Sequence, residues 1–170
     1  MEQKKLTKEE NFVNHLIQAF KNDKGFKADM KAAYPTTTSL KVYDYLYKWC
    51  DMDKEYLSLP YLFIAADMAK TNPKENGKLP LGTAFRIAYT DNGEFRKETA
   101  LPKMQMLLTC RDLKSLLIEL EWVLELISSR HIVVDYVLLL TELKRFKFSQ
   151  EKIKKEWALC FLGKVKDEVQ

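Results

Sequence analysis

Apolar residues recur at helical spacing along almost the whole chain, and this periodicity limits the possible folds more than any other feature. The two most apolar segments, Leu113–Ile127 and Val134–Phe146, have the length of helices. No segment shows the strict alternation of a half-buried strand over a useful length. The pattern therefore predicts an all-α fold, a compact bundle of about eight to nine helices.

Polar capping residues and prolines locate the expected helices. Thr7, Ser39, Asp112 and Ser149 each precede a segment of helical periodicity. Pro60 is expected in the first turn of its helix, where a missing N–H costs nothing. The predicted helices are one that begins after Thr7, then Phe26–Ala33, Leu40–Trp49, Leu59–Ala69, Leu81–Tyr89, Ala100–Thr109, Leu113–Ile127 and Val134–Phe146, and one that begins after Ser149.

The same spacing predicts the core. Apolar residues form two stripes along Leu113–Ile127, so we expect both of these faces to be covered. The second stripe consists of Ile118, Trp122 and Leu126. The side chains that we expect to be buried on stripe spacing are Leu116, Leu117, Leu120, Leu124, Leu138 and Trp157.

The length of 170 residues, of which 46% are hydrophobic, suits one ordinary domain. We expect a single all-helical domain over residues 1–170, or two packed helical subdomains with a loop at 71–80. The clearest loop is Thr71–Lys78, which contains proline, glycine and asparagine. The sequence leaves open whether the helices enclose one core or two.

Cysteine usage predicts a reducing compartment. Cys50, Cys110 and Cys160 are odd in number, widely spaced and not part of a CxxC pair. The first ten residues are charged and lack the apolar segment of a signal peptide. No run of apolar residues reaches the length of about 18 residues that a membrane span needs. We therefore expect a cytoplasmic protein with no membrane partner.

The sequence offers little for catalysis. His15 and His131 are the only histidines, so a histidine-based triad or a multi-histidine metal site is hard to build. No phosphate-binding glycine loop is present. Glu119, Glu121 and Glu125 are best explained as a solvated helix face. We expect a protein that is not an enzyme, has no catalytic residues and needs no metal or cofactor.

Two groups of basic residues are candidates for nucleic-acid contact. The segment Lys144–Lys155 carries six bases against the single acid Glu151, a net +5, while the whole chain carries only +4. Phe146 and Phe148 interleave with these bases, as in surfaces that stack on unpaired bases. The alternative is an exposed turn with solubilising lysines and two core phenylalanines. The bases of this segment are Lys144, Arg145, Lys147, Lys152, Lys154 and Lys155.

The second group lies around the helices expected at 81–89, 100–109 and 113–127. Arg86 has apolar neighbours, so it can instead pair with a carboxylate at a helix junction. The members of this group are Arg86, Arg96, Lys97, Lys103, Arg111 and Lys114.

An ordered set of segments along the chain resembles the CasB family, the small subunit of the type I-E CRISPR Cascade complex. Phe12-Val-Asn-His-Leu16 and Tyr43-Asp-Tyr-Leu46 resemble the family's opening and third helices. The strongest similarities lie in the C-terminal half. They are Leu79-Pro-Leu-Gly-Thr-Ala-Phe-Arg86, Leu101-Pro-Lys-Met-Gln-Met-Leu-Leu108, Arg111-Asp-Leu-Lys-Ser-Leu-Leu117, Ile132-Val-Val-Asp-Tyr-Val-Leu-Leu139 and Lys154-Lys-Glu-Trp-Ala-Leu-Cys-Phe161.

Two departures from the family pattern affect the expected affinity for DNA. Thr83 stands where an arginine usually follows Leu-Gly, and Glu119, Glu121 and Glu125 stand on a helix that tends to be arginine-rich. If those arginines touch DNA in relatives, this chain must use other positions or bind more weakly.

The resemblance implies a non-catalytic subunit for antiviral defence. Such a subunit binds DNA non-specifically and stabilises the displaced strand and the R-loop during crRNA-guided recognition. Its implied partners are other Cascade subunits and the crRNA-containing complex, single-stranded or duplex DNA, and paired copies of itself. The alternative is a helical protein–protein adaptor without nucleic-acid binding. Binding that falls steeply with salt would distinguish the first from the second.

Overall fold

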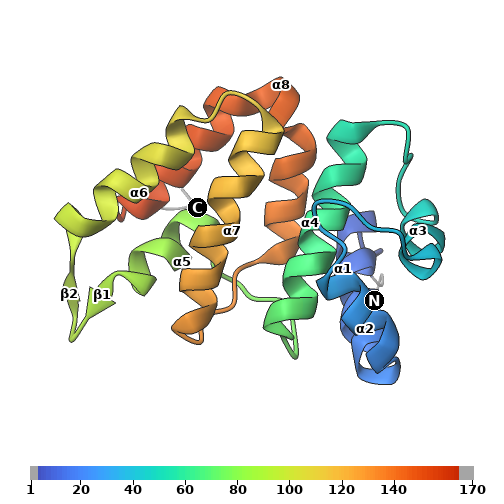
Figure 1. The fold of residues 1–170 in the computed structure, drawn as a ribbon. Coiled ribbons are helices and arrows are strands. Elements are labelled where there is room, and N and C mark those ends of the chain that lie inside the picture. The colour runs from blue at the N-terminus through green and yellow to red at the C-terminus, as the bar shows by residue number, and fades with distance from the viewer. Residues whose placement is uncertain (1–3, 165–170) are drawn as a thin grey trace. The chain divides into compact units, whose positions relative to one another are not determined.

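A computed structural model describes residues 4–164 of the chain. These residues form eight helices and one short β-hairpin (Figure 1), which confirms the all-α class and the expected number of helices. None of the described helices is long and apolar enough to cross a membrane. The chain divides into two compact units between Asn76 and Gly77. The expectation of one domain over the whole chain stays a prediction.

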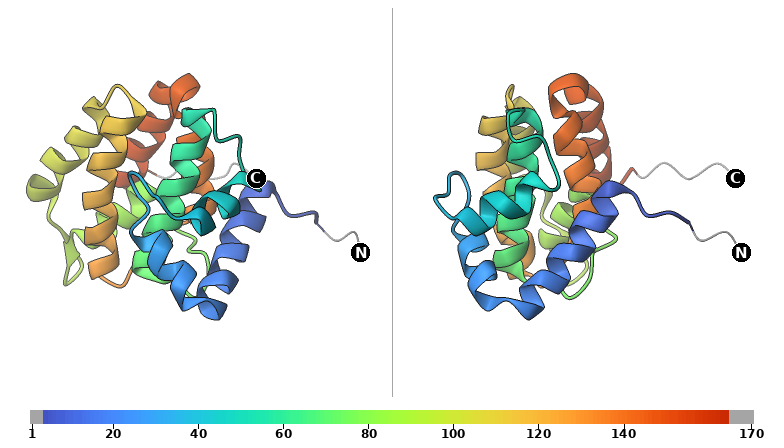
Figure 2. Two further views of the ribbon diagram at one scale, coloured as in Figure 1. Left: turned by 45° about the vertical axis from the view of Figure 1, so that its right-hand side comes forward. Right: turned by 90° about the vertical axis from the view of Figure 1, so that its right-hand side faces the viewer.

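The N-terminal unit consists of four helices: α1 (Lys8–Asn22), α2 (Lys24–Lys31), α3 (Leu40–Tyr47) and α4 (Glu55–Thr71). Thr7 caps α1 in a reciprocal capping box with Glu10, which satisfies two otherwise unpaired backbone N–H groups. Asp23 ends α1 and caps α2, so the two helices meet in a V (Figure 2). Phe12 packs edge-on against the rings of Trp49 and Tyr61, which makes the core of this unit strongly aromatic.

The C-terminal unit contains α5 (Leu81–Ala88), α6 (Lys97–Thr109), α7 (Leu113–Ser129) and α8 (Tyr136–Phe161). A hairpin of β1 (Thr90–Asp91) and β2 (Glu94–Phe95) joins α5 to α6. Asn92 and Gly93 both adopt positive φ at its turn, the backbone that a tight two-residue hairpin requires. Each strand has only two residues, which is too short for an alternating pattern in the sequence.

Helix α8 folds back on itself at Ser149, whose backbone is not helical (φ −139°, ψ 32°). The indole N–H of Trp157 donates to the Glu142 carboxylate over 2.8 Å. Fifteen residues of straight helix would span about 22 Å. The bond therefore requires that α8 is bent at Ser149 into two arms, a first arm over 136–148 and a second arm over 150–161. Figure 1 shows these arms on either side of the bend. The sequence places a helix boundary at this same serine.

Helices α5 and α8 approach unusually closely at Gly82. A Cβ atom built on this glycine would lie 2.2 Å from the carbonyl oxygen of Trp157 and 2.9 Å from the Phe161 nitrogen. Only glycine fits this contact without a backbone shift. The Leu-Gly pair in the segment 79–86 thus has a packing role.

Three sequence expectations are wrong in detail. Helix α4 begins at Glu55, four residues before the predicted start, so Pro60 lies inside it. Leu138 is only half-buried, whereas the other five residues expected in the core are buried. The second stripe of α7 is not covered, because Ile118 is 56% and Trp122 71% exposed. A periodic apolar stripe shows which face of a helix can be buried, but not whether a neighbouring helix covers that face.

Candidate nucleic-acid interface

The bend of α8 brings parts of the two basic groups together. Beyond Ser149, the Gln150 amide donates to the carbonyl of Arg111 over 2.9 Å, and the Lys154 ammonium donates to the carbonyl of Cys110. Cys110 and Arg111 connect α6 to α7, so this connection lies beside the second arm of α8. The end of α6, the start of α7 and the bend of α8 therefore form one corner of the C-terminal unit.

Four bases at this corner are exposed and form no ion pair or side-chain hydrogen bond with any residue between 4 and 164. Lys152 and Lys155 are three residues apart on the second arm, so they share one face of it. Arg145 lies on the first arm, and Arg111 on the α6–α7 connection. We call this set the basic corner; it consists of Arg111, Arg145, Lys152 and Lys155.

The other bases of the same region have contacts within the protein. Lys154 is half-buried, with its ammonium on the Cys110 carbonyl and 5.5 Å from the Phe146 ring centroid. Lys147 lies 5.6 Å from the Phe148 ring centroid. Lys114 and Lys144 also interact with other described residues. These contacts give Lys154 a structural role, whereas the four residues of the basic corner have no such contact with residues 4–164.

The two phenylalanines of the basic segment differ. Phe146 is 1% exposed and belongs to the core, whereas Phe148 is 69% exposed. Of these two rings, only that of Phe148 is exposed enough to stack on an unpaired base. The alternative of two core phenylalanines holds only for Phe146.

Arg86 is held by the fold. Its guanidinium donates to the carbonyl of Phe161 over 3.1 Å and lies 4.1 Å from the centroid of the Phe95 ring. Phe161 is the last residue of α8, where unpaired carbonyls and the helix dipole favour a cation. Arg86 thus stabilises the contact between α5 and α8. Its hydrogen-bond partner at the junction is a carbonyl, and no carboxylate among residues 4–164 pairs with it.

The remaining candidates lie beyond the corner. Arg96 pairs with Asp91 of the hairpin at 2.7 Å, and Arg130 binds the same carboxylate at 3.1 Å. Lys97 is exposed at the start of α6. Lys103 is exposed further along α6 and lines a groove between α5, α6 and α7. The structure therefore separates the second basic group into structural, hairpin, groove and corner positions, and Arg111 is its member at the basic corner.

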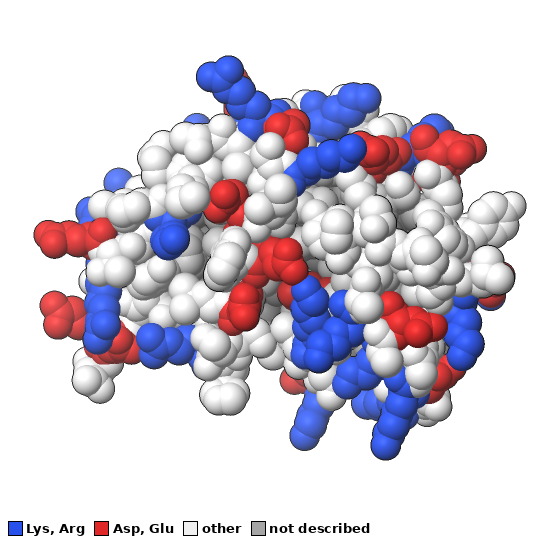
Figure 3. Space-filling model, viewed as in Figure 1, with Lys and Arg blue, Asp and Glu red and all other residues white. Residues whose placement is uncertain are grey.

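A basic face on α2 is absent from the candidates chosen on sequence. Three of its eight residues are lysines, Lys24, Lys27 and Lys31, against the single acid Asp29. Figure 3 shows lysine and arginine side chains gathered around this helix. The sequence signal was a short basic helix, which by itself does not separate a binding surface from an ordinary solvated face.

Two titratable side chains outside the basic groups, His15 and Glu142, have defined partners in the fold. His15 is exposed, and its Nδ1 lies 2.9 Å from the hydroxyl of Tyr45. Glu142 is buried, and burial raises the pKa of its carboxyl to about 7. Within residues 4–164, no three side chains of His, Cys, Asp or Glu gather in a way that could hold a metal ion.

Comparison with known proteins gives a consistent result. The family model described as CRISPR-associated protein Cse2 matches residues 27–161, which is well over half of the chain. No curated protein matches the sequence. Among solved structures, CasB from M. ruber is similar over 96% of this chain and 97% of its own, with a TM-score of 0.74 and 18% identity.

Two further structures have the same fold. A chain of a CRISPR RNA-guided surveillance complex is 17% identical, with a TM-score of 0.73 over 92% of this chain and 90% of its own. A CRISPR-associated protein of the Cse2 family from Thermus thermophilus is 17% identical, with a TM-score of 0.72 over 93% of this chain and 99% of its own. At these identities the similarity establishes the fold.

Proposed function

This chain belongs to the Cse2 family of CRISPR-associated proteins, and from that premise we propose that it is a non-catalytic small subunit of the type I-E Cascade complex. In this role it binds the displaced DNA strand without sequence preference and stabilises the R-loop in antiviral defence. Its partners are the other subunits, the crRNA-containing complex and a second copy of itself. The similar fold of a chain in an RNA-guided surveillance complex supports the proposal.

The basic corner is the observation that carries the DNA-binding part of the proposal. Its four bases are exposed and make no polar side-chain contact within residues 4–164. Lys152 and Lys155 lie in the first turns of the second arm of α8, where a cation opposes the helix dipole. Helix stability therefore does not account for them. Contacts between such bases and phosphates are independent of sequence, as the proposed role requires.

Small contributions to the free energy of R-loop formation are sufficient for this role. Opening the target exchanges DNA base pairs for RNA–DNA pairs of about equal stability, so a few phosphate contacts can shift the balance. The exposed ring of Phe148 adds a surface on which an unpaired base can stack.

The test is a reconstituted complex that carries Arg145→Glu, Lys152→Glu and Lys155→Glu together. We expect normal assembly and target binding weakened at least tenfold, to a similar degree for unrelated target sequences. The matched control is Lys24→Glu, Lys27→Glu and Lys31→Glu, which makes the same change of charge on α2. Unchanged affinity in the corner variant would refute the proposal. Loss of assembly with no effect on DNA would favour the protein–protein adaptor.

A further inference from the structure

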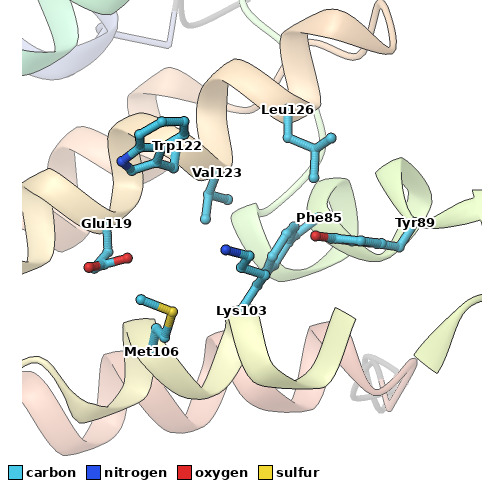
Figure 4. A pocket seen from close by; sticks show the side chains of 8 residues that line it. All are labelled: Phe85, Tyr89, Lys103, Met106, Glu119, Trp122, Val123 and Leu126. Carbon is cyan, nitrogen blue, oxygen red and sulfur yellow. The ribbon is translucent and has the colours of Figure 1, made fainter. Parts of the chain in front are cut away.

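The uncovered stripe of α7 forms one side of a groove within the C-terminal unit. The groove has a volume of about 360 Å³ and lies between α5, α6 and α7. Phe85, Met106 and Val123 supply apolar walls, and the exposed indole of Trp122 stands at its edge (Figure 4). A groove of this size falls within the range of small-molecule sites, at about 300–1,000 Å³.

Two opposite charges face into this apolar space. Lys103 reaches into the groove from α6, and Glu119 from α7 (Figure 4). Neither forms an ion pair or a hydrogen bond with another described residue. The groove thus offers one group that only donates hydrogen bonds and one that, when ionised, only accepts them.

The charges of Lys103 and Glu119 together restrict the kind of ligand that the groove can bind. An anion would meet the Glu119 carboxylate, and a cation would meet the Lys103 ammonium. A purely apolar side chain would desolvate both charges without giving either a partner. A neutral planar ring that carries both acceptors and N–H donors on its edge satisfies both. Its faces can stack on Trp122, because aromatic rings stack favourably on the bases of nucleic acids.

We propose that the groove between α5, α6 and α7 binds a single unpaired nucleobase, stacked on Trp122 and hydrogen-bonded at its edge by Lys103 and Glu119. The inference rests on the proposed function for the source of the base, which is the displaced strand. It assigns Lys103 to a base and not to a phosphate. Phosphates at the basic corner and a base in the groove are then held by different groups.

The first experiment uses the full-length protein and neutral deoxynucleosides, which contain no phosphate. The chain has three tryptophans, and the indole N–H signal of Trp122 is identified in NMR spectra by its loss in Trp122→Phe. Deoxyadenosine and deoxycytidine should shift this signal and leave that of the buried Trp157 unchanged. Lys103→Met and Glu119→Gln should each weaken the response. No shift up to the solubility limit, or an equal affinity for benzyl alcohol, would overturn the proposal.

The second experiment separates this inference from the proposed function. A short single strand and the same strand with abasic sites are compared in binding to the reconstituted complex. Trp122→Ala should weaken binding of the base-containing strand roughly tenfold and leave the abasic strand unaffected. Ile118→Ala, an exposed apolar change one turn away on α7, should affect neither. If Trp122→Ala weakens both strands equally or neither, the base site is wrong, whereas the role of the basic corner is judged by its own variant.

Discussion

At the contact between α5 and α8, Arg86 is half-buried and its guanidinium is shared between the Phe161 carbonyl and the Phe95 ring. At the basic corner of the same unit, Arg145, Lys152 and Lys155 are exposed and make no polar side-chain contact within the described chain. The first site uses positive charge to complete a helix end, and the second leaves it available to a ligand. Residue type alone therefore does not identify a DNA-binding base.

The largest effect on the free energy of unfolding is expected at Gly82, where α5 meets α8. Gly82→Ala places a methyl group 2.2 Å from the Trp157 carbonyl, so the two helices must separate. We expect a loss of about 3 kcal/mol or more in the free energy of unfolding, measured by urea denaturation.

Gly25→Ala in α2 is the matched control for this change. Its nearest neighbour would be the Asp23 Oδ1 atom at 3.4 Å, an ordinary contact. Alanine is the better helix former, so we expect a gain of about 0.5 kcal/mol. A Gly82→Ala protein as stable as the wild type would show that the close contact is not needed.

The next effect concerns Glu142 and Trp157, which join the two arms of α8. Burial raises the pKa of Glu142 from an ordinary 4.5 to about 7. Between these values the folded protein keeps a proton that the unfolded chain releases. The contribution of Glu142 to the free energy of unfolding is therefore highest below pH 4.5. It falls as the pH rises towards 7, by at most about 3 kcal/mol in total.

Glu142→Gln removes this dependence and retains an acceptor for the Trp157 indole. The free energy of unfolding of the variant, relative to the wild type, should increase between pH 5 and pH 8. Exposed Glu125→Gln on α7 serves as the control. A difference between Glu142→Gln and wild type that stays constant over this range would contradict the assignment.

A third comparison sets Arg86 against Lys152. Arg86→Ala removes a charge-assisted hydrogen bond and a cation–π contact, and we expect it to cost about 2 kcal/mol. Lys152→Ala removes an exposed side chain and should change stability by less than about 0.5 kcal/mol. Thermal and urea unfolding measure both. Equal losses in the two variants would remove the distinction between structural and available bases.

Local features of the sequence predict most of the fold. Thr7, Ser39 and Asp112 cap α1, α3 and α7 as expected, because a capping residue and an apolar face are adjacent in sequence. The start of α4 is not predicted, since the rule for proline in the first turn places it too late. The exposure of Trp122 is not predicted either, because it depends on neighbours distant in sequence.

The candidate site is predictable only as a set of residue types. Net charge in the segment 144–155 indicates the region, but the role of each base depends on tertiary contacts. Arg86 meets Phe161 across 75 positions of sequence, and Lys154 meets Cys110 across 44. Periodicity and charge counts contain no information about such pairs. Which bases contact DNA stays a prediction.

The salt dependence of binding tests the central claim most directly. The complex is reconstituted with Arg145→Gln, Lys152→Gln and Lys155→Gln, and its affinity for a single strand is measured over a range of salt concentrations. Each phosphate contact contributes about 0.7 to the slope of log affinity against log salt, so the slope should become shallower by about 2. Lys24→Gln, Lys27→Gln and Lys31→Gln together should leave the slope unchanged. A wild-type slope in the corner variant would show that these bases do not contact phosphate and would contradict the account.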